Sequence, residues 1–359
     1  MTKTIVLTGG GTAGHVTPNM ALLPFLRKDG WRIHYIGTEN GIERSLIEPI
    51  ADIAYHAVSS GKLRRYFSLK NFSDPFRVLR GMSQSRALMR ELKPDVIFAK
   101  GGFVCVPVVY AAKSCGVPVV LHESDYTCGL ANKLCAPKSQ TVCVSFEPTL
   151  QHVKGNKGVW TGSPIRQSLL EGQFDRAQLF CHFPEPQKPW ILFMGGSLGS
   201  AALNEAVKQS LTWLCERYNV VHIRGKGNLD ASLIHKSYRQ YEFVGEEMAD
   251  LYAASALLVC RSGANTLFEL LALCKPSVLV PLPAAQSRGD QILNARYFEK
   301  LGYAHVLMQE DMTPENLQQS ILKAFCQIPS MQRAMAQSPM KDGTQNVLKE
   351  IYSAAGVSF

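Results

Sequence analysis

Two successive series of short β-branched runs, each opening into a glycine-rich turn, constrain the fold of this chain more than any other feature. Longer segments of helical pattern separate the runs, and this alternation is typical of βαβ units with parallel sheets. We therefore expect an α/β protein with two doubly wound, Rossmann-like domains. The expected strands occupy residues 4–9, 32–37, 54–58, 95–100, 118–124, 141–146 and 157–162 in the first series, and residues 190–196, 220–225, 241–245, 257–263, 277–282 and 305–309 in the second.

A turn-rich segment, Gly162-Ser163-Pro164, separates the two series. A chain of 359 residues is too long for one ordinary hydrophobic core and suits two. We expect a first domain of residues 1–165, a hinge near residues 161–166 and a second domain of residues 166–342. The helical tail, residues 343–359, is expected to pack back on the first domain. Ligands of doubly wound sheets bind at the carboxyl ends of the strands, so we expect a ligand there, in the crevice between the domains.

The composition indicates a cytoplasmic protein. None of the ten cysteines forms a C-x-x-C pair, and several lie in apolar strand-like runs, which favours buried, reduced thiols over disulfides. The first apolar run is too short for a signal peptide. The longest apolar stretch, residues 103–121, is interrupted by Lys113 and two prolines, so we do not expect a membrane span.

The net charge of +9 indicates an acidic partner, and much of the excess is local. Between residues 62 and 93, aromatic and aliphatic residues are interleaved with lysines and arginines. This pattern suits a peripheral contact with an anionic membrane surface. The alternative is a solvated helix whose apolar side packs on the core. No nucleic-acid-binding signature is present, so a nucleic-acid partner is not expected. The cations of this basic segment run from residue 62 to residue 93: Lys62, Arg64, Arg65, Lys70, Arg77, Arg80, Arg86, Arg90 and Lys93.

One glycine loop follows the first strand of each series. Residues 9–14 satisfy G-x-G-x-x-G, so a dinucleotide-dependent dehydrogenase has to be considered. That fingerprint also requires an acid at the end of the second strand, and Glu39 comes too late. A second loop, residues 195–200, also opens a helix, where backbone N–H groups and the helix dipole favour an anion. Either loop alone could be a tight turn, but both together indicate a phosphate-bearing ligand.

A third cluster follows the expected strand of residues 257–263. Glu269 lies in the helix that begins after Gly263, where its carboxylate could accept both hydroxyls of a ribose. The alternative is an acid placed there by the helix dipole. Further along, the amide of Gln291 could bind sugar hydroxyls, because it both donates and accepts hydrogen bonds.

Six segments in order along the whole chain resemble the MurG family of glycosyltransferases. They are GGGTAGHVTPN from residue 9, HESDYTCGLANK at 122–133, TGSPIR at 161–166, GGSLGS at 195–200, CRSGANTLFEL at 260–270 and DQILNA at 290–295. The resemblance implies the GT-B fold, with two Rossmann-like domains facing across a cleft. It also implies transfer of N-acetylglucosamine (GlcNAc) from UDP-GlcNAc to lipid I, undecaprenyl-pyrophosphoryl-MurNAc-pentapeptide, to make lipid II for peptidoglycan at the cytoplasmic face of the membrane.

The resemblance also assigns binding roles. It places the first loop at the diphosphates, the backbone of Val244 at the uracil edge, Glu269 at the ribose diol and Gln291 at the GlcNAc. Two positions depart from the family: Asp125 stands where many members have Asn, and Asp290 where glutamine is frequent. The implied binding residues are Thr12, Ala13, Gly14, Asp125, Arg166, Ser197, Val244, Ala264, Asn265, Thr266, Leu267, Phe268, Glu269 and Gln291.

The expected mechanism is an inverting displacement by the C4 hydroxyl of MurNAc, with UDP as the leaving group. The chain contains no D-x-D and no zinc-type Cys/His spacing, so we expect no metal and no cofactor. Backbone amides, helix N-termini and Arg166 would stabilise the charge on the diphosphate. His15 is the favoured general base and Glu123 the alternative. The structural alternatives are a histidine that closes the turn and a capping carboxylate.

Overall fold

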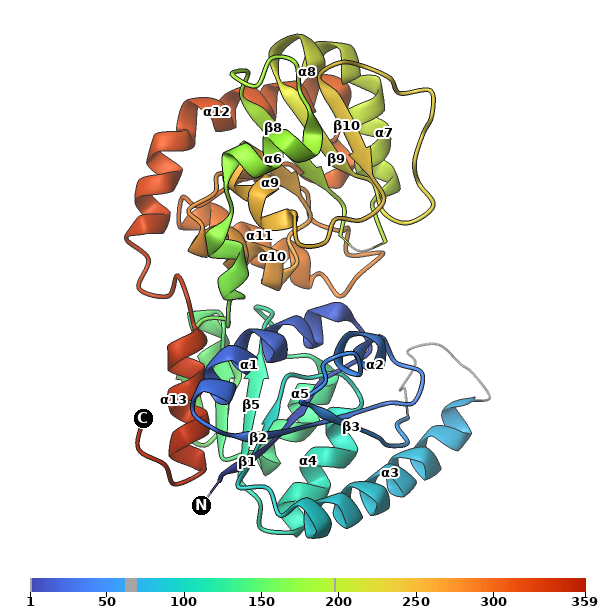
Figure 1. The fold of residues 1–359 in the computed structure, drawn as a ribbon, viewed down its shortest axis with the longest axis vertical. Helices are drawn as coiled ribbons and strands as arrows, with labels where there is room; N and C mark the ends of the chain where they lie inside the picture. Colours follow the sequence, from blue (N-terminus) through green and yellow to red (C-terminus); the bar gives the residue numbers. More distant parts are fainter. Residues whose placement is uncertain (1, 62–69, 197) are drawn as a thin grey trace. The chain divides into compact units, whose positions relative to one another are not determined.

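The structure is a computed structural model that describes residues 2–61, 70–196 and 198–359, with the backbone alone for residues 70–75. The chain divides into two compact units (Figure 1). The first comprises Met1–Arg166 and Asp342–Phe359, and the second comprises Gln167–Lys341. Each unit has its own sheet, and all the strand pairs in the described parts of the chain are parallel. The expected α/β class is confirmed.

The first unit contains a seven-stranded sheet in the order β3-β2-β1-β4-β5-β6-β7. The order reverses at β1, which is the arrangement of a doubly wound sheet. Its strands are β1 (Thr4–Thr8), β2 (Arg32–Gly37), β3 (Ala54–Ala57), β4 (Val96–Ala99), β5 (Val119–Glu123), β6 (Thr141–Val144) and β7 (Gly158–Trp160). Its helices are η1 (Ala13–His15), α1 (Thr17–Lys28), α2 (Ile42–Ile47), α3 (Lys70–Leu92), α4 (Cys105–Ser114), α5 (Leu130–Cys135), η2 (Ala136–Lys138), η3 (Glu147–His152) and α13 (Thr344–Ala354).

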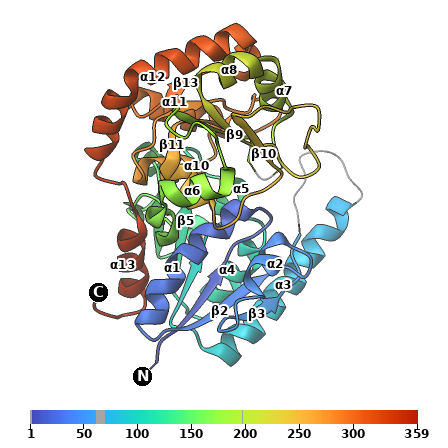
Figure 2. The same cartoon turned by 45° about the horizontal axis from the view of Figure 1, so that its top comes forward.

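Helices cover both faces of this sheet, because alternate residues of each strand point to opposite sides. Ile5 and Leu7 of β1 pack with α1 and α13, whereas Val6 packs with α4 on the other face. The contact between α1 and α13 can be followed in Figure 2. Two buried apolar layers therefore sandwich the strands and leave their carboxyl ends to be closed by loops.

The C-terminal helix α13 belongs to the first unit. Val347, Leu348 and Ile351 lie in the same core cluster as α1 and β1. Its start is tied to residues 163–165, where Gly343 N donates to Ser163 O at 3.0 Å and Ile165 N to Thr344 Oγ1 at 3.0 Å. Arg166 is the last residue of the first unit before the chain enters the second.

The second unit contains a six-stranded sheet in the order β10-β9-β8-β11-β12-β13, again reversing at its first strand. Helix α12 packs against β11, β12 and β13, and α9 packs on β8. The strands are β8 (Trp190–Met194), β9 (Asn219–Ile223), β10 (Tyr238–Tyr241), β11 (Ser255–Cys260), β12 (Ser277–Leu279) and β13 (His305–Val306). The helices are η4 (Gln167–Glu171), α6 (Phe174–Cys181), α7 (Ala201–Gln209), α8 (Leu211–Arg217), α9 (Met248–Ala254), α10 (Ala264–Ala272), α11 (Asp290–Lys300), η5 (Gln309–Asp311) and α12 (Pro314–Ala336).

One expected strand is displaced. The sequence predicts a strand over residues 241–245, but β10 covers Tyr238–Tyr241 and the apolar residues that follow lie in a loop. The edge position explains the error, because polar side chains are tolerated there. Arg239 donates to the carbonyls of Cys181 and His182, and Gln240 donates to Asp230 O at 2.7 Å.

Two expectations from composition can be compared with the structure. All ten cysteines are free thiols. Among the described residues, no helix is long and apolar enough to cross a membrane.

Candidate functional site

The first glycine loop is closed on one side by the end of β4. Gly10 N donates to Gly101 O at 3.3 Å, and a Cβ on Gly102 would lie 2.2 Å from Gly10 O. Gly102 also has φ of +84°, a conformation that favours glycine. The loop then enters η1, where His15 N donates to Thr12 O and Val16 N to Ala13 O. The first N–H groups of such a turn have no acceptor inside it, so they suit an anion.

Glu43 closes the other side of this loop, and the sequence did not single it out. Its carboxylate is 0% exposed and accepts from Gly11 N at 3.0 Å, Thr38 N at 3.0 Å and Thr38 Oγ1 at 2.6 Å. A Cβ on Gly10 would lie 2.5 Å from that carboxylate. Glu43 thus fills the space beside Gly10 and ties the loop to Thr38 at the end of the second strand. The available signal was an acid in the first turn of the short helix after the second strand.

His15 is half-buried at the end of η1 and is oriented by its own loop. Its Nδ1 lies 2.9 Å from Gly10 O and 3.3 Å from Thr12 Oγ1. A carbonyl oxygen only accepts, so this contact assigns the proton to Nδ1 and the lone pair to Nε2. Such an imidazole is prepared to accept a proton at Nε2.

Glu123, the alternative base, ends β5 and is buried. Its Oε1 accepts from Asp125 N at 3.0 Å, and its Oε2 accepts from Gly129 N at 2.9 Å and Asn132 Nδ2 at 2.8 Å. These contacts anchor the loop of residues 124–129, including the backbone of Asp125. Three of its roughly four acceptor sites are thus taken by internal donors.

A buried cation, Lys100, lies beneath the same strand ends. Its Nζ donates to His122 Nδ1 at 2.7 Å and to Ser124 Oγ, and His122 Nε2 lies 2.9 Å from Gly162 O. Burial lowers the pKa of Lys100 to about 8, against the opposing attraction of Glu123 and Asp125. Burial and the lysine charge hold the pKa of His122 well below its usual range, so His122 is neutral.

In the second unit, the glycine loop after β8 begins α7. Ser200 caps this helix by accepting from Leu203 N at 3.2 Å. A Cβ on Gly199 would lie 2.0 Å from Arg224 O, so the loop packs closely on the chain that follows β9. Ser197, one of the expected UDP contacts, lies outside the described residues.

Helix α10 begins immediately after Gly263, and a Cβ on that glycine would meet no atom within 4 Å. Glu269 is partly exposed on this helix, and Tyr252 Oη donates to its Oε2 at 3.2 Å. Leu267 and Phe268 point into the core, so only their backbone could take part in binding. Ala264 is also buried, whereas Asn265 and Thr266 are partly exposed.

Arg261, another residue that the sequence did not single out, ties together the strand ends of this unit. Its guanidinium donates to Val280 O at 3.0 Å, Ser200 Oγ at 2.6 Å and Gln309 Oε1 at 2.5 Å. Burial lowers its pKa from the ordinary value, although an arginine remains charged. Arg261 thereby joins the cap of α7 to the ends of β11 and β12.

The remaining expected residues have different settings. Gln291 Oε1 accepts from Leu282 N at 3.1 Å, which holds the amide against the end of β12. Val244 is buried in the loop after β10, and its backbone groups make no hydrogen bond with other described residues. Arg166 is half-buried. Asp290 begins α11 and pairs with Arg288 at 2.8 Å.

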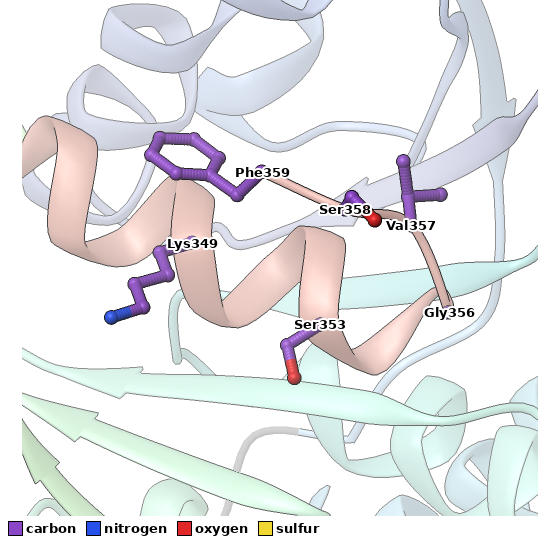
Figure 3. Close-up of a pocket in the computed structure, with 6 residues that line it drawn as sticks. All are labelled: Lys349, Ser353, Gly356, Val357, Ser358 and Phe359. Carbon is purple, nitrogen blue, oxygen red and sulfur yellow. The ribbon is translucent and has the colours of Figure 1, made fainter.

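An open pocket of 710 Å³ lies at the C-terminus of the first unit. Figure 3 shows that Lys349 and Ser353 of α13 line it together with the last four residues, Gly356, Val357, Ser358 and Phe359. Lys3 Nζ donates to Ala355 O at 3.1 Å, so this region lies near the amino end of β1, opposite its glycine loop. The described residues also contain no group of three or more His, Cys, Asp or Glu side chains that could hold a metal ion.

Known glycosyltransferases match this chain over nearly its whole length. The glycosyltransferase family 28 N-terminal domain matches residues 5–144, and the C-terminal domain of that family matches residues 190–350. A relative from Geobacillus thermodenitrificans is 50% identical over 99% of this chain and 100% of its own length. A relative from Clostridium perfringens is 49% identical over 98% of both chains. Both are named UDP-N-acetylglucosamine--N-acetylmuramyl-(pentapeptide) pyrophosphoryl-undecaprenol N-acetylglucosamine transferase.

Solved structures agree with this relationship. The crystal structure of Acinetobacter baumannii MurG matches with a TM-score of 0.75 and 28% identity, over 98% of this chain and 99% of the other. The glycosyltransferase of kitacinnamycin also gives a TM-score of 0.75, but at 14% identity it shows the fold alone. The two Rossmann-like units are those of the GT-B fold, and the chain belongs to the MurG family of glycosyltransferases.

Proposed function

We propose that the protein transfers GlcNAc from UDP-GlcNAc to the C4 hydroxyl of MurNAc in lipid I, with inversion at the anomeric carbon and without a metal. The observation that carries this proposal is the setting of Glu269. It is an oriented, partly exposed carboxylate on a helix that begins beside an open glycine, in a chain 50% identical to transferases named for this donor and acceptor.

The second unit is proposed to bind the donor. Glu269 would accept the ribose hydroxyls, and the N-terminus of α10 would receive the diphosphate between Ala264 and Thr266. The backbone of Val244 makes no hydrogen bond within the described part of the chain, which supports a role at the uracil edge, since an amide and a carbonyl can pair with that edge. Gln291 would contact the GlcNAc through its Nε2, because its Oε1 is already bound to Leu282 N. The proposed contacts of Ser197 and Arg166 with UDP rest on the family motif alone.

The first unit is proposed to supply the base and to bind the acceptor. His15 Nε2 would take the proton of the C4 hydroxyl as that oxygen attacks the anomeric carbon. Thr12, Ala13 and Gly14 would donate N–H groups to a diphosphate at the start of η1. Negative charge grows on UDP as it leaves, and helix N-termini with Arg166 would stabilise it in place of a metal. Asp125 would help to bind UDP-GlcNAc, because Glu123 holds the backbone of its loop in place.

Helix α3 is proposed to contact an anionic membrane surface on the cytoplasmic side. Phe76 is 74% exposed and Leu79 is 61% exposed, beside exposed Arg77 and Arg80. Apolar side chains flanked by cations suit the boundary between acyl chains and anionic headgroups. The part of the basic segment at residues 62–69 lies outside the described residues. Sedimentation with vesicles of anionic lipid should pull down the wild type, and Leu79→Asp should weaken this association.

The decisive experiment is to incubate the protein with UDP-GlcNAc and a short-chain lipid I analogue in EDTA and to measure UDP release. We expect acceptor-dependent release that chelation does not reduce. Loss of turnover in EDTA would refute metal independence alone. A failure of calorimetry to detect UDP binding would refute the assignment of the donor site.

A further inference from the structure

One peptide group of the first glycine loop lies between a buried carboxylate and the proposed base. The amide between Gly10 and Gly11 presents its carbonyl to His15 Nδ1 at 2.9 Å and its N–H to Glu43 Oε2 at 3.0 Å. The C=O and N–H of a trans peptide point in opposite directions, so the two side chains approach this group from opposite sides. Glu43, the peptide and His15 therefore form a continuous hydrogen-bonded chain.

Every described hydrogen bond to Glu43 comes from a donor. Gly11 N–H, Thr38 N–H and the Thr38 hydroxyl all point to its two oxygens. Glu43 therefore acts only as an acceptor, which is the hydrogen-bonding pattern of a carboxylate. Its negative charge lies at one end of the chain, in a site that solvent does not reach.

We infer that Glu43 is a positioning residue for the base: it polarises the Gly10–Gly11 peptide and stabilises the protonated form of His15. This inference rests on the proposed role of His15. A hydrogen bond at the N–H of an amide makes its carbonyl a stronger acceptor, because hydrogen bonds in a chain polarise one another. The arrangement corresponds to a carboxylate–histidine pair with one amide inserted between the partners.

The inserted amide sets the size of the effect. In a direct carboxylate–histidine pair, the acid also selects the imidazole tautomer, and its loss costs about 10⁴ in kcat. Here the carbonyl of Gly10 selects the tautomer whether or not Glu43 is charged. Only the charge effect remains, and we expect a loss of about tenfold in kcat when it is removed.

Apart from the buried cation Lys100, the other ionisable groups near this chain are neutral near pH 7 or lie on exposed surface. Burial, and to a smaller extent the Glu43 charge, raises the pKa of Tyr35 on β2 and of Tyr55 on β3. Burial likewise raises the pKa of Cys105 at the start of α4 to about 12. The remaining charges are Arg44, Glu39 and Glu48 around α2, which pair with one another, and Lys100 beside Gly9.

The direct test is the titration of His15 in the free protein, followed by NMR of ¹⁵N-labelled histidine. Comparison with His15→Ala assigns its signal among the nine histidines. We expect Glu43→Gln to lower the midpoint of this titration by about one pH unit, since the negative charge that favours the imidazolium is removed. Asp95→Asn is the matched control: Asp95 also accepts a backbone N–H, from Thr4 at 2.8 Å, but at the amino end of β1. It should leave the midpoint unchanged, and an equal shift in both variants would overturn the inference.

Activity provides a second readout. The acidic limb of kcat/KM should move to lower pH in Glu43→Gln while the plateau falls about tenfold, since a weaker base stays deprotonated further into acid. Full activity in His15→Ala would refute the base assignment itself, whereas loss there with an unmoved limb in Glu43→Gln would refute only the relay. If Glu43→Gln does not fold, the wild-type Gly11 amide proton serves instead. Its NMR shift should follow the titration of His15, and a Gly11 signal that ignores that titration would overturn the relay.

Discussion

The two units place a buried cation at corresponding positions and use it differently. Lys100 follows β4, the strand beside β1, and Arg261 follows β11, the strand beside β8. Each reaches the end of the next strand along: Lys100 binds His122 on β5, and Arg261 binds the carbonyl of Val280 after β12. The lysine contacts a histidine and a serine hydroxyl, whereas the arginine contacts carbonyls, a hydroxyl and an amide. One topology thus supports an ionisable network in the first unit and a permanently charged brace in the second.

The glycine loops of the two units also differ: the first is closed on both sides and the second is open on one. In the first unit Glu43 fills one side of the loop and Gly102 closes the other, which leaves a rigid mount for His15. In the second unit the corresponding position beside β11 is Gly263, and a Cβ there would meet no atom within 4 Å. The contrast teaches that the fold supplies the same strand-end loop twice, and that the residues around it decide whether the loop is closed or open.

The strongest way to break this comparison is to remove His15. His15→Ala should lower kcat by roughly 10²–10⁴ because the base is lost. The affinity for UDP, measured by calorimetry, should be unchanged, since the donor is assigned to the other unit. A weaker UDP affinity with normal kcat would reverse the roles of the two units.

A pair of glycine substitutions tests the closed and open loops directly. Gly102→Ala should destabilise the first unit by about 2–4 kcal/mol, because the methyl meets Gly10 O and the backbone φ is positive. Gly263→Ala should cost only about 0.5–1 kcal/mol: alanine is a poorer N-cap than glycine, but φ is −67° and the space is empty. Urea unfolding measures both.

Binding separates the same two variants in the opposite direction. If the space beside Gly263 receives a diphosphate, the methyl group of alanine in Gly263→Ala should weaken UDP binding about tenfold in calorimetry. Unchanged UDP affinity in Gly263→Ala would mean that the opening is not the diphosphate site.

The sequence was sufficient for the parallel sheets, because strand and helix periodicities are local, and for the family, because its motifs are contiguous. It missed Glu43 and Arg261 because their roles depend on chain folded around them from distant strands. Glu43 contacts a loop 32 residues away, and Arg261 reaches Ser200 and Gln309. The sequence also could not show that Glu123 anchors the loop of residues 124–129, since that depends on which donors surround it.

Glu269 offers a test of the nucleotide side of the comparison. Glu269→Ala should weaken binding of UDP by about 10–100-fold, the range for losing charged hydrogen bonds. It should have much less effect on 2′-deoxy-UDP, which lacks one of the hydroxyls. Tyr252→Phe should give a smaller change in the same direction, because Glu269 loses a hydrogen bond that orients its carboxylate. Equal losses for both nucleotides would place Glu269 away from the ribose.

The smallest effect concerns the two buried cations and appears as a pH dependence of stability. Burial lowers the pKa of Lys100 from 10.5 to about 8, so folding disfavours its charged form. That penalty is present in full below pH 8 and disappears as pH rises toward 10.5, the pKa of the lysine in the unfolded chain.

The free energy of opening β4, from hydrogen exchange, should therefore gain about 1 kcal/mol between pH 8 and pH 9 relative to the same strand in Lys100→Met. Buried thiols titrate in the opposite sense but equally in both proteins, so the difference isolates the lysine. Arg261 does not titrate in this range, so β11 should show no such gain, and equal pH dependence of β4 in wild type and Lys100→Met would remove the distinction between the two cations.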